Sequence, residues 1–377
     1  MSLPFLVYDI IIRVYAFLIR MAAPFNLKAR KWVDGRKEWY RSLEKTLPPG
    51  GADIWMHCAS LGEFEQGRPV LENLRRNHPE KYILLTFFSP SGYEVRKNYA
   101  NANHICYLPL DTRENAYRLT LLVKPRLVIF VKYEFWFHLL KVLDERRIPV
   151  LLISAIFRPD QFFFRWYGKP FRKSLVYYKK IFVQDKHSAG LLQKAGVTGA
   201  VVAGDTRFDR VIGVAAHPRK LPALEAFLQG DRPWVAGSTW LHDEELIRAC
   251  HRPISKWIIA PHEVTATRLL QIEKIFPGKT VRYSTLLAAP EKFLQQTILL
   301  VDNVGMLSSL YRYGAVAYVG GGFDHGIHNI LEAAVYGVPV VFGPKYHKFK
   351  EAVDLIGIGG AFTVSDEKDL EKVMIKL

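Results

Sequence analysis

Short apolar runs alternate with segments of helical length along most of the chain, and this alternation constrains the fold more than any other feature. Because these runs are apolar at successive positions, they predict strands buried on both faces, as in a parallel sheet covered by helices. Seven runs fill the first half, at residues 52–60, 82–88, 104–110, 126–131, 149–154, 180–185 and 199–204. They are enough for one complete Rossmann-like domain.

A second series of apolar runs follows a stretch that lacks the alternation. The segment 204–222 breaks the pattern and is interpreted as a linker. The runs resume at 233–238, 256–261, 297–302, 315–320 and 338–343. A chain of 377 residues also exceeds what one hydrophobic core usually covers. We therefore predict an α/β fold of two Rossmann-like domains, at 46–204 and 231–377, joined by a linker at 205–230 and preceded by an N-terminal membrane-associated helix and basic segment at 1–45.

The charge balance points to an anionic partner. The chain carries 52 Lys and Arg against 36 Asp and Glu, a formal net charge of +16. Nucleic acid, an acidic membrane surface and a phosphorylated substrate are all compatible with this excess. The three cysteines, Cys58, Cys106 and Cys250, are far apart and form no CxxC pair, so neither a disulfide framework nor a zinc site is expected.

The first 27 residues favour the membrane among these partners. Residues 3–27 are largely apolar, while Ser2, Asp9, Arg13 and Arg20 fall within about 40° of one another on a helix, where Asp9 and Arg13 can pair. The charges disfavour a membrane-spanning helix, and no signal-peptide cleavage site follows. An interfacial helix fits, because a basic segment suited to an anionic leaflet comes next. That segment contains Lys28, Arg30, Lys31, Arg36, Lys37 and Arg41, interleaved with Trp32 and Trp39. The alternative is a helix packed on the domain, followed by a solvated basic loop.

The first strand leads into a turn with a candidate general base. Ser60, Gly62 and Glu63 follow it, with Gly62 allowing a tight turn and Glu63 in the first turn of the next helix. A helix N-terminus favours the ionised carboxylate, which can accept a proton. The alternative, a carboxylate that only satisfies free N–H groups at the helix start, is equally compatible with the position. Glu134 and Trp136, after another strand, are assigned to the core and the rim of the sheet.

The second domain has four polar strand ends. Ser238 and Thr239 offer hydroxyls and backbone N–H groups, Gly320–Gly322 let a backbone approach a ligand, and a helix start at 328–332 suits a phosphate. No GxGxxG fingerprint with its acidic partner and no Walker A sequence is present. Four histidines raise the question of a metal, but their spacing matches no known zinc motif, so no metal and no cofactor is expected. They are His57, His262, His325 and His328, of which His262 and His328 are interpreted as hydrogen-bond donors to a phosphate or sugar.

Two successive doubly wound domains are expected to bring the carboxyl ends of both sheets to a shared cleft. Nucleotide-sugar transferases of the GT-B fold, sugar-nucleotide epimerases and two-domain binding proteins all use this layout, so the layout alone leaves the function open.

The motifs, taken in order, resemble the 3-deoxy-D-manno-octulosonic acid (Kdo) transferase family of GT-B glycosyltransferases. The resemblance covers nearly the whole chain and includes the N-terminal membrane-seeking helix. The matching motifs are Ser-x-Gly-Glu at 60–63, Glu-x-Trp at 134–136, Ala-Gly-Ser-Thr at 236–239, Pro-His at 261–262, the Gly-rich turn at 320–322 and His-Asn-x-Leu-Glu at 328–332. The chain departs from the family at Met306, where the family has Glu, at Gly322, where it has Ser, and at Ile327, where it has Gly.

The resemblance implies an inverting transfer of Kdo from CMP-Kdo to a lipid A precursor (lipid IVA) in lipopolysaccharide biosynthesis, at the cytoplasmic face of the inner membrane of a Gram-negative cell. It makes Glu63 the catalytic base and assigns Ser60, Gly62, Glu134 and Trp136 to acceptor binding or structural support. Donor binding falls to Ser238, Thr239, His262, Gly305, Met306, Leu307, Gly320, Gly321, Gly322, His328, Asn329 and Glu332.

Two other functions fit parts of the pattern. A sugar-nucleotide epimerase shares the layout, but epimerases are soluble and the amphipathic N-terminus counts against one. A non-catalytic membrane-bound binding module is the other alternative. Nucleic acid is not expected as a partner, because the sequence has no recognisable nucleic-acid-reading motif.

Overall fold

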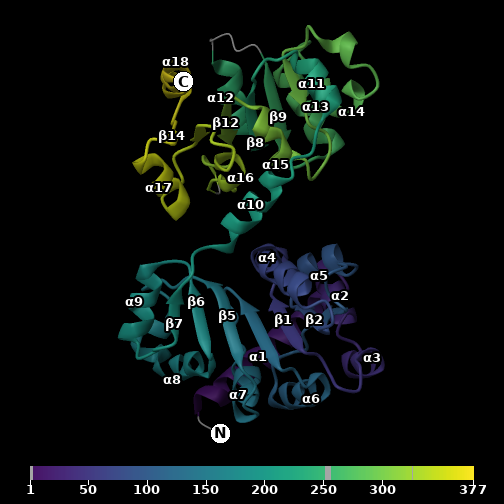
Figure 1. Ribbon diagram of the computed structural model, residues 1–377, viewed down its shortest axis with the longest axis vertical. Helices are drawn as coiled ribbons and strands as arrows, with labels where there is room; N and C mark the ends of the chain where they lie inside the picture. The colour runs from purple at the N-terminus through teal and green to yellow at the C-terminus, as the bar shows by residue number, and fades with distance from the viewer. Residues whose placement is uncertain (1–2, 251–255, 325) are drawn as a thin grey trace. The chain divides into compact units, whose positions relative to one another are not determined.

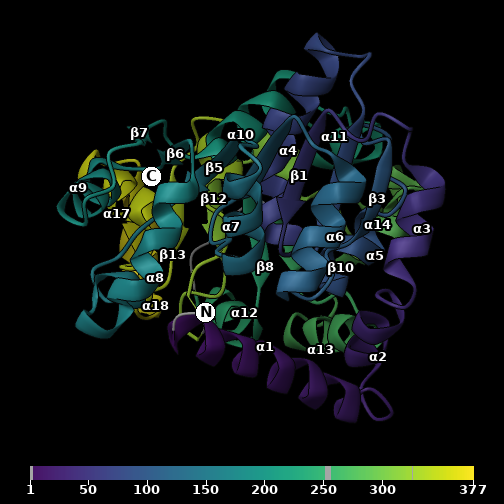
Figure 2. The ribbon, with the colours of Figure 1, turned by 90° about the horizontal axis from the view of Figure 1, so that it is seen from below.

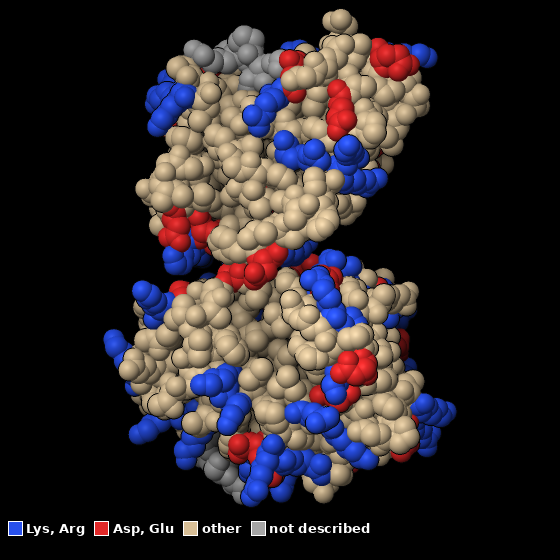
Figure 3. All heavy atoms as spheres, viewed as in Figure 1, with Lys and Arg blue, Asp and Glu red and all other residues tan. Residues whose placement is uncertain are grey.

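The computed structural model of the protein describes residues 3–250, 256–324 and 326–377. Residues Met1–Arg210 and Val211–Leu377 form two compact domains, each with its own sheet and core (Figure 1). The first domain holds 34 Lys and Arg against 19 Asp and Glu, whereas the second holds 18 against 17. Nearly all of the excess positive charge therefore belongs to the first domain, and Figure 3 shows basic side chains spread over the face in view.

The first domain is built on a parallel sheet of seven strands in the order β3-β2-β1-β4-β5-β6-β7. The strands are β1 (Ile54–Cys58), β2 (Ile83–Phe87), β3 (His104–Tyr107), β4 (Leu127–Val131), β5 (Val150–Ala155), β6 (Lys180–Val183) and β7 (Ala200–Val202). The seven strands expected in this half are confirmed. The strands β2 and β3 follow β1 on one side of it, whereas β4 pairs with β1 on the other side. The strand order therefore reverses between β1 and β4.

Helices cover both faces of this sheet. On one face Trp55 and Phe130 pack under α6 and α7; on the other, Met56 of β1 packs with Phe64 of α4. Each such buried side chain contributes about 1.5–3 kcal/mol relative to exposure. The helices are α2 (Leu27–Asp34), α3 (Trp39–Thr46), α4 (Leu61–Asn77), α5 (Pro90–Arg96), α6 (Arg113–Val123), α7 (Phe137–Glu145), α8 (Lys169–Arg172) and α9 (Lys186–Lys194).

The N-terminal helix α1 (Leu3–Ala22) packs on the first domain through one face (Figure 2). Ile12 and Ala16 are buried in this contact. The Tyr8 hydroxyl donates to Asp111 Oδ2 at 2.7 Å, and His138 Nε2 lies 2.7 Å from Asp9 Oδ1. The expected polar stripe is therefore corrected in part: Asp9 faces the domain and pairs with His138 of α7 instead of with the next turn of its own helix. Ser2 lies outside the described residues.

The other face of α1 is exposed and mainly apolar. Phe17 is 58% exposed and Leu18 60%, and the apolar surface also includes Leu6, Val7, Ile10, Ile11, Val14, Tyr15 and Met21. Within the part of the chain that the structure describes, no helix combines the length and apolarity needed to cross a bilayer.

The second domain repeats the architecture, with seven parallel strands in the order β10-β11-β9-β8-β12-β13-β14. Its strand order reverses between β8 and β12. The strands are β8 (Trp234–Thr239), β9 (Trp257–Pro261), β10 (Thr280–Arg282), β11 (Ile298–Leu300), β12 (Val316–Val319), β13 (Val340–Phe342) and β14 (Ala361–Thr363). The sequence analysis missed β10 and β14, because each is a three-residue strand at an edge of the sheet and carries too short an apolar run to detect.

The helices of the second domain are α11 (Pro222–Leu228), α12 (Leu241–Ala249), α13 (Ala266–Ile275), α14 (Tyr283–Leu286), α15 (Leu307–Leu310), α16 (Leu331–Ala334), α17 (Lys350–Gly357) and α18 (Glu367–Lys376). The linker expected at 205–230 is largely helical. The domain boundary falls inside α10 (Thr206–Ala216), and α11 buries Leu224 and Phe227 in the core of the second domain. The second domain thus begins before residue 231.

Candidate functional site

The turn after β1 holds the predicted base at the point where the first strand order reverses. Ser60 is the N-cap of α4: its hydroxyl accepts from the Gly62 N–H at 3.2 Å and donates to the Glu63 carboxylate. Glu63 is half-buried. Gly62 has no positive φ and has room for a side chain, so the turn does not depend on the freedom that glycine allows. The hydroxyl of Ser60, rather than a special turn, positions Glu63.

Cations gather at the same edge of the first sheet. Lys132 follows β4 in a left-handed conformation (φ 72°), which costs a non-glycine residue about 1–3 kcal/mol. Burial lowers the pKa of Lys132, and the charges of Arg158 and Arg207 lower it further, while Glu63 and Asp205 raise it. These charges are therefore close enough to interact. These cations were not predicted from the sequence. Each lies within a few residues of a strand end, and that position could have indicated them.

Glu134 is a buried structural residue rather than an open carboxylate. It is 3% exposed, and its carboxylate accepts from Trp136 Nε1 and lies 3.2 Å from His57 Nε2. Its backbone carbonyl accepts from the Tyr178 hydroxyl, and His57 Nδ1 lies 2.9 Å from Thr86 Oγ1. The assignment of Glu134 to the core agrees with this network, which ties the ends of β1 and β4 together.

At the edge of the second sheet, the two hydroxyls at the end of β8 have different surroundings. Ser238 is partly exposed and left-handed (φ 54°). Thr239 is buried and donates to Glu244 Oε1 at 2.8 Å, while Arg268 donates to the other carboxylate oxygen. Burial raises the pKa of Glu244. The expectation that the Thr239 hydroxyl faces a ligand is therefore corrected, because that hydroxyl holds a buried acid.

The triple-glycine turn after β12 is required by the packing of the chain on itself. A Cβ at Gly320 would lie 2.4 Å from the Ser238 carbonyl oxygen, and one at Gly322 would lie 2.6 Å from the Gly343 nitrogen. Gly321 has a φ of +89°, which favours glycine. The sequence analysis explained these glycines by the approach of a ligand; the structure gives a sufficient reason within the protein.

A buried carboxylate that the sequence analysis missed fixes this turn. Asp243, 1% exposed in the first turn of α12, accepts from the Gly321 N–H at 3.1 Å and the Trp240 N–H at 2.9 Å. It also accepts from the Tyr318 hydroxyl at 2.8 Å. The available signal was the acidic run directly after a polar strand end.

Three aromatic rings form a stack beside the turn. The His262 ring lies 4.7 Å from the Trp240 ring and 4.4 Å from the His328 ring, both nearly parallel to it. Trp240 Nε1 donates to His328 Nε2 at 3.2 Å. His262 remains exposed. The structure therefore brings together the two histidines that the sequence analysis singled out, although they come from different strands.

The remaining predicted donor-binding residues lie around the same sheet edge. Gly305 is exposed with φ +94°, whereas the Met306 side chain is buried in the core and Leu307 begins α15. Asn329 donates to Glu332 Oε1 at 3.2 Å. Among the described residues, no group of His, Cys, Asp and Glu is arranged to hold a metal ion, and His325 lies outside them.

A family match and two relatives carry the same description. The family described as 3-deoxy-D-manno-octulosonic-acid transferase (kdotransferase) matches residues 31–210. The 3-deoxy-D-manno-octulosonic acid transferase of Aquifex aeolicus is 28% identical over 330 residues, covering 86% of this chain and 85% of the relative. The enzyme of the same description from Haemophilus influenzae is 28% identical over 343 residues, covering 85% and 77%.

Comparison with solved structures reports on the fold alone. The UDP-GlcNAc 2-epimerase of Neisseria meningitidis superimposes with a TM-score of 0.59 at 14% identity, covering 86% of this chain and 90% of the epimerase. The glycotransferase of kitacinnamycin superimposes with a TM-score of 0.52 at 13% identity, covering 87% and 91%. The two-domain layout is thus shared by epimerases and glycosyltransferases, so this likeness does not choose between them.

Proposed function

The chain belongs to the 3-deoxy-D-manno-octulosonic-acid transferase family and is a glycosyltransferase, and on this premise we propose that it transfers Kdo from CMP-Kdo to a hydroxyl of a lipid A precursor. The observation that carries the chemical part of the proposal is Glu63. It is the half-buried carboxylate at the reversal point of the first sheet, held by the Ser60 hydroxyl and close to the charge of Lys132.

In the proposed reaction Glu63 accepts the proton of the attacking hydroxyl. The new bond forms between that oxygen and the anomeric carbon of Kdo as the bond from this carbon to the CMP phosphate breaks. A single displacement of this kind inverts the anomeric centre. Glu134 is unsuited to the role because its carboxylate is buried and already accepts from Trp136.

We assign donor binding to the edge of the second sheet. Ser238 is the accessible hydroxyl there, and His262 and His328 offer ring nitrogens beside the glycine turn. Oriented N–H and O–H donors stabilise the negative charge that develops on a departing phosphate. Because Asp243 and Glu244 hold this edge in place, its donors need little rearrangement before binding.

The acceptor is expected to be lipid-anchored, and we propose that α1 attaches the first domain to the cytoplasmic leaflet of the inner membrane as an interfacial helix. Two features support this: the exposed apolar face of α1 and the concentration of the positive charge in the first domain.

The transfer reaction is tested by incubating the protein with CMP-Kdo and lipid IVA and following the acceptor by mass spectrometry. We expect the mass of the acceptor to rise by one or more Kdo units, and the number of units added is read from the same spectrum. UDP-GlcNAc serves as the control donor. Epimerisation of UDP-GlcNAc without any Kdo transfer would refute the proposal.

The attachment is tested separately by flotation with vesicles that contain phosphatidylglycerol. Replacing Ile11 and Leu18 by Ser removes two exposed apolar side chains without touching the core, and we expect release from the vesicles. Ile358→Ser, at a side chain 81% exposed in the second domain, is the control and should leave binding unchanged. Unchanged binding of the double variant would exclude α1 as the anchor.

A further inference from the structure

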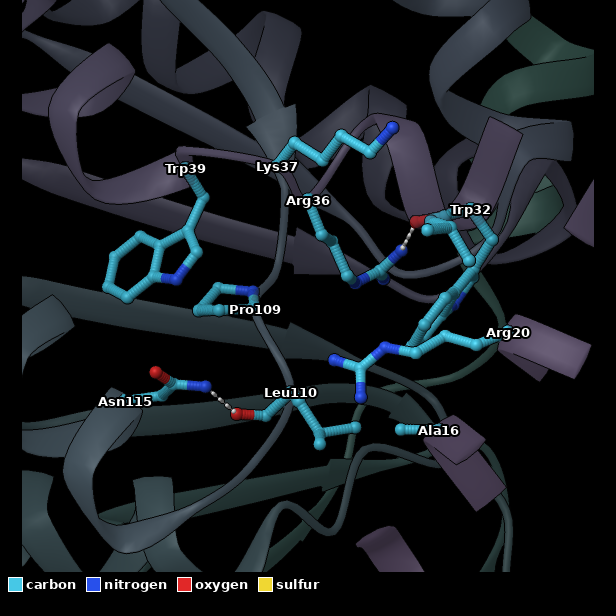
Figure 4. A pocket seen from close by; sticks show the side chains of 10 residues that line it. Ala16, Arg20, Trp32, Arg36, Lys37, Trp39, Pro109, Leu110 and Asn115 are labelled. Carbon is cyan, nitrogen blue, oxygen red and sulfur yellow. Dashed lines mark hydrogen bonds between the residues drawn. The ribbon is translucent and has the colours of Figure 1, made fainter. Parts of the chain in front are cut away.

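A pocket of about 350 Å³ opens in the first domain where α1 meets the segment after α2 (Figure 4). Its walls come from five parts of the chain: α1, the end of α2 with the turn that follows, the start of α3, residues 109–110 after β3, and α6. Ala16, Pro109 and Leu110 make part of the wall apolar. Arg20 and Arg36 bring positive charge into it, and Figure 4 shows both guanidinium groups facing the same space.

Arg36 is a positive charge that the surrounding protein holds in place. Its guanidinium donates to the carbonyls of Leu108, Trp32 and Phe88 at 2.9, 3.0 and 2.7 Å, and stacks 4.0 Å from the Trp32 ring. Burial lowers its pKa to about 9, which leaves it charged at neutral pH. Within the described part of the chain no carboxylate pairs with it. A buried, uncompensated cation is costly unless an anion accompanies it.

Other groups in the pocket point to the same kind of ligand. Arg20 makes no ion pair or hydrogen bond with any described residue. Trp32 lines the pocket and is 6% exposed, and the described residues offer its buried Nε1–H no hydrogen-bond partner. Lys37 lies at the rim, where it pairs with Asp34 at 2.7 Å. Two guanidinium groups converging on one space match the geometry of a phosphate, which accepts paired N–H donors.

We propose that this pocket binds the phosphate headgroup of an anionic membrane lipid. A lipid is favoured because Arg20 and Ala16, which line the pocket, stand next to Phe17 and Met21 on α1, whose exposed apolar side chains would contact the acyl chains of a lipid seated there. The inference rests on the proposed attachment of α1 to a membrane and is independent of the transfer reaction.

Calorimetric titration with dihexanoyl phosphatidic acid, kept below its micelle concentration, tests the pocket without a membrane. Arg20→Gln should weaken binding about tenfold, because it removes a charge-assisted hydrogen bond to phosphate. Arg13→Gln is the matched control, since it makes the same change on the same exposed helix away from the pocket. It should weaken binding less than about twofold.

Equal losses in the two variants would mean diffuse electrostatic attraction and would overturn the proposal. Inorganic phosphate that binds as tightly as the lipid, with the same dependence on Arg20, would show an adventitious anion site and would also overturn it. Vesicles of phosphatidic acid in phosphatidylcholine form the third arm. If the short-chain lipid binds through Arg20 but the vesicles do not bind, the pocket is supported and the attachment of α1 fails.

Discussion

The two domains share a parallel sheet of seven strands, although β11 lies between β9 and β10 in the second, and they use the carboxyl edges of their sheets differently. In both sheets the first strand is central, and later strands pair on its other side. Polar residues lie at the point where the strand order reverses. At the first edge these are ionic: Glu63 beside Lys132, in a domain that carries almost all of the net charge. At the second edge Asp243 and Glu244 are buried and hydrogen-bonded, and the accessible groups include Ser238 and His262. The same scaffold thus presents a carboxylate beside a lysine in one domain and a hydroxyl and an imidazole in the other.

Both edges nevertheless contain backbone strain. Lys132 and Ser154 in the first domain and Ser238 in the second are non-glycine residues with φ of 72°, 52° and 54°, each directly at a strand end. Such conformations persist only where the surroundings hold them. Ser154, for example, is hydrogen-bonded to Thr206 Oγ1 at 2.6 Å.

The largest effect is expected for a variant that tests whether the general base lies at the carboxyl edge of the first sheet. Glu63→Gln removes the proton acceptor while keeping its shape, and we expect turnover to fall about 10²–10⁴-fold. The affinity for CMP, measured by calorimetry, should stay unchanged, because binding is assigned to the second domain. Glu72→Gln, on the same helix, is the control and should retain turnover. A Glu63→Gln variant that keeps its activity would remove the contrast between the edges.

The second largest effect is expected for a variant that tests whether the stability of the second domain depends on the close backbone contact at Gly320. Gly320→Ala places a Cβ against the Ser238 carbonyl, and we expect a loss of about 2–4 kcal/mol in the stability of the second domain. Urea unfolding, with hydrogen exchange to assign the loss to this domain, is the measurement. Gly357→Ala, where a Cβ meets open space, should change stability by less than about 1 kcal/mol. Equal stability of the two variants would show that the edge tolerates a side chain.

A smaller effect concerns how the first domain holds α1, a helix without counterpart in the second. Tyr8→Phe leaves the buried Asp111 carboxylate without one of its donors, and we expect a loss of about 1–3 kcal/mol. Faster amide exchange along α1 should report it. Tyr15→Phe, on the same helix, is the control, since the described residues offer its hydroxyl no hydrogen bond. Exchange that is equally slow in both variants would mean that apolar packing alone holds α1.

The smallest expected effect is a pH dependence of the stability of the second domain. Burial raises the pKa of Asp243, so the folded state prefers the protonated acid. The contribution of this group to stability is therefore present below its unfolded pKa and is lost as pH rises through its folded pKa. On acidification from pH 7 towards pH 5, the thermal midpoint of the wild type should rise relative to that of Asp243→Asn. A constant difference between the two midpoints would contradict a raised pKa.

Much of the fold could be predicted because it depends on local pattern. Residues 54–56 of β1 and 234–236 of β8 are apolar at successive positions, as burial on both faces of a parallel sheet requires. The two strands missed, β10 and β14, lie at sheet edges, where fewer neighbours demand apolar side chains. The helix start at Glu63 was visible for the same local reason, since Ser60 is a capping residue three positions before it.

The sequence by itself determined the α/β class, the two series of strands, the family motifs and the apolar and basic character of the first residues. Each of these features depends on residues that are close together in the sequence. Only the tertiary structure decided that Thr239 and Asp243 turn inward, that Gly320 and Gly322 pack against other strand ends, and that Arg36 lines a pocket with Arg20. Those outcomes depend on which distant segments meet, and spacing along a chain does not contain that information.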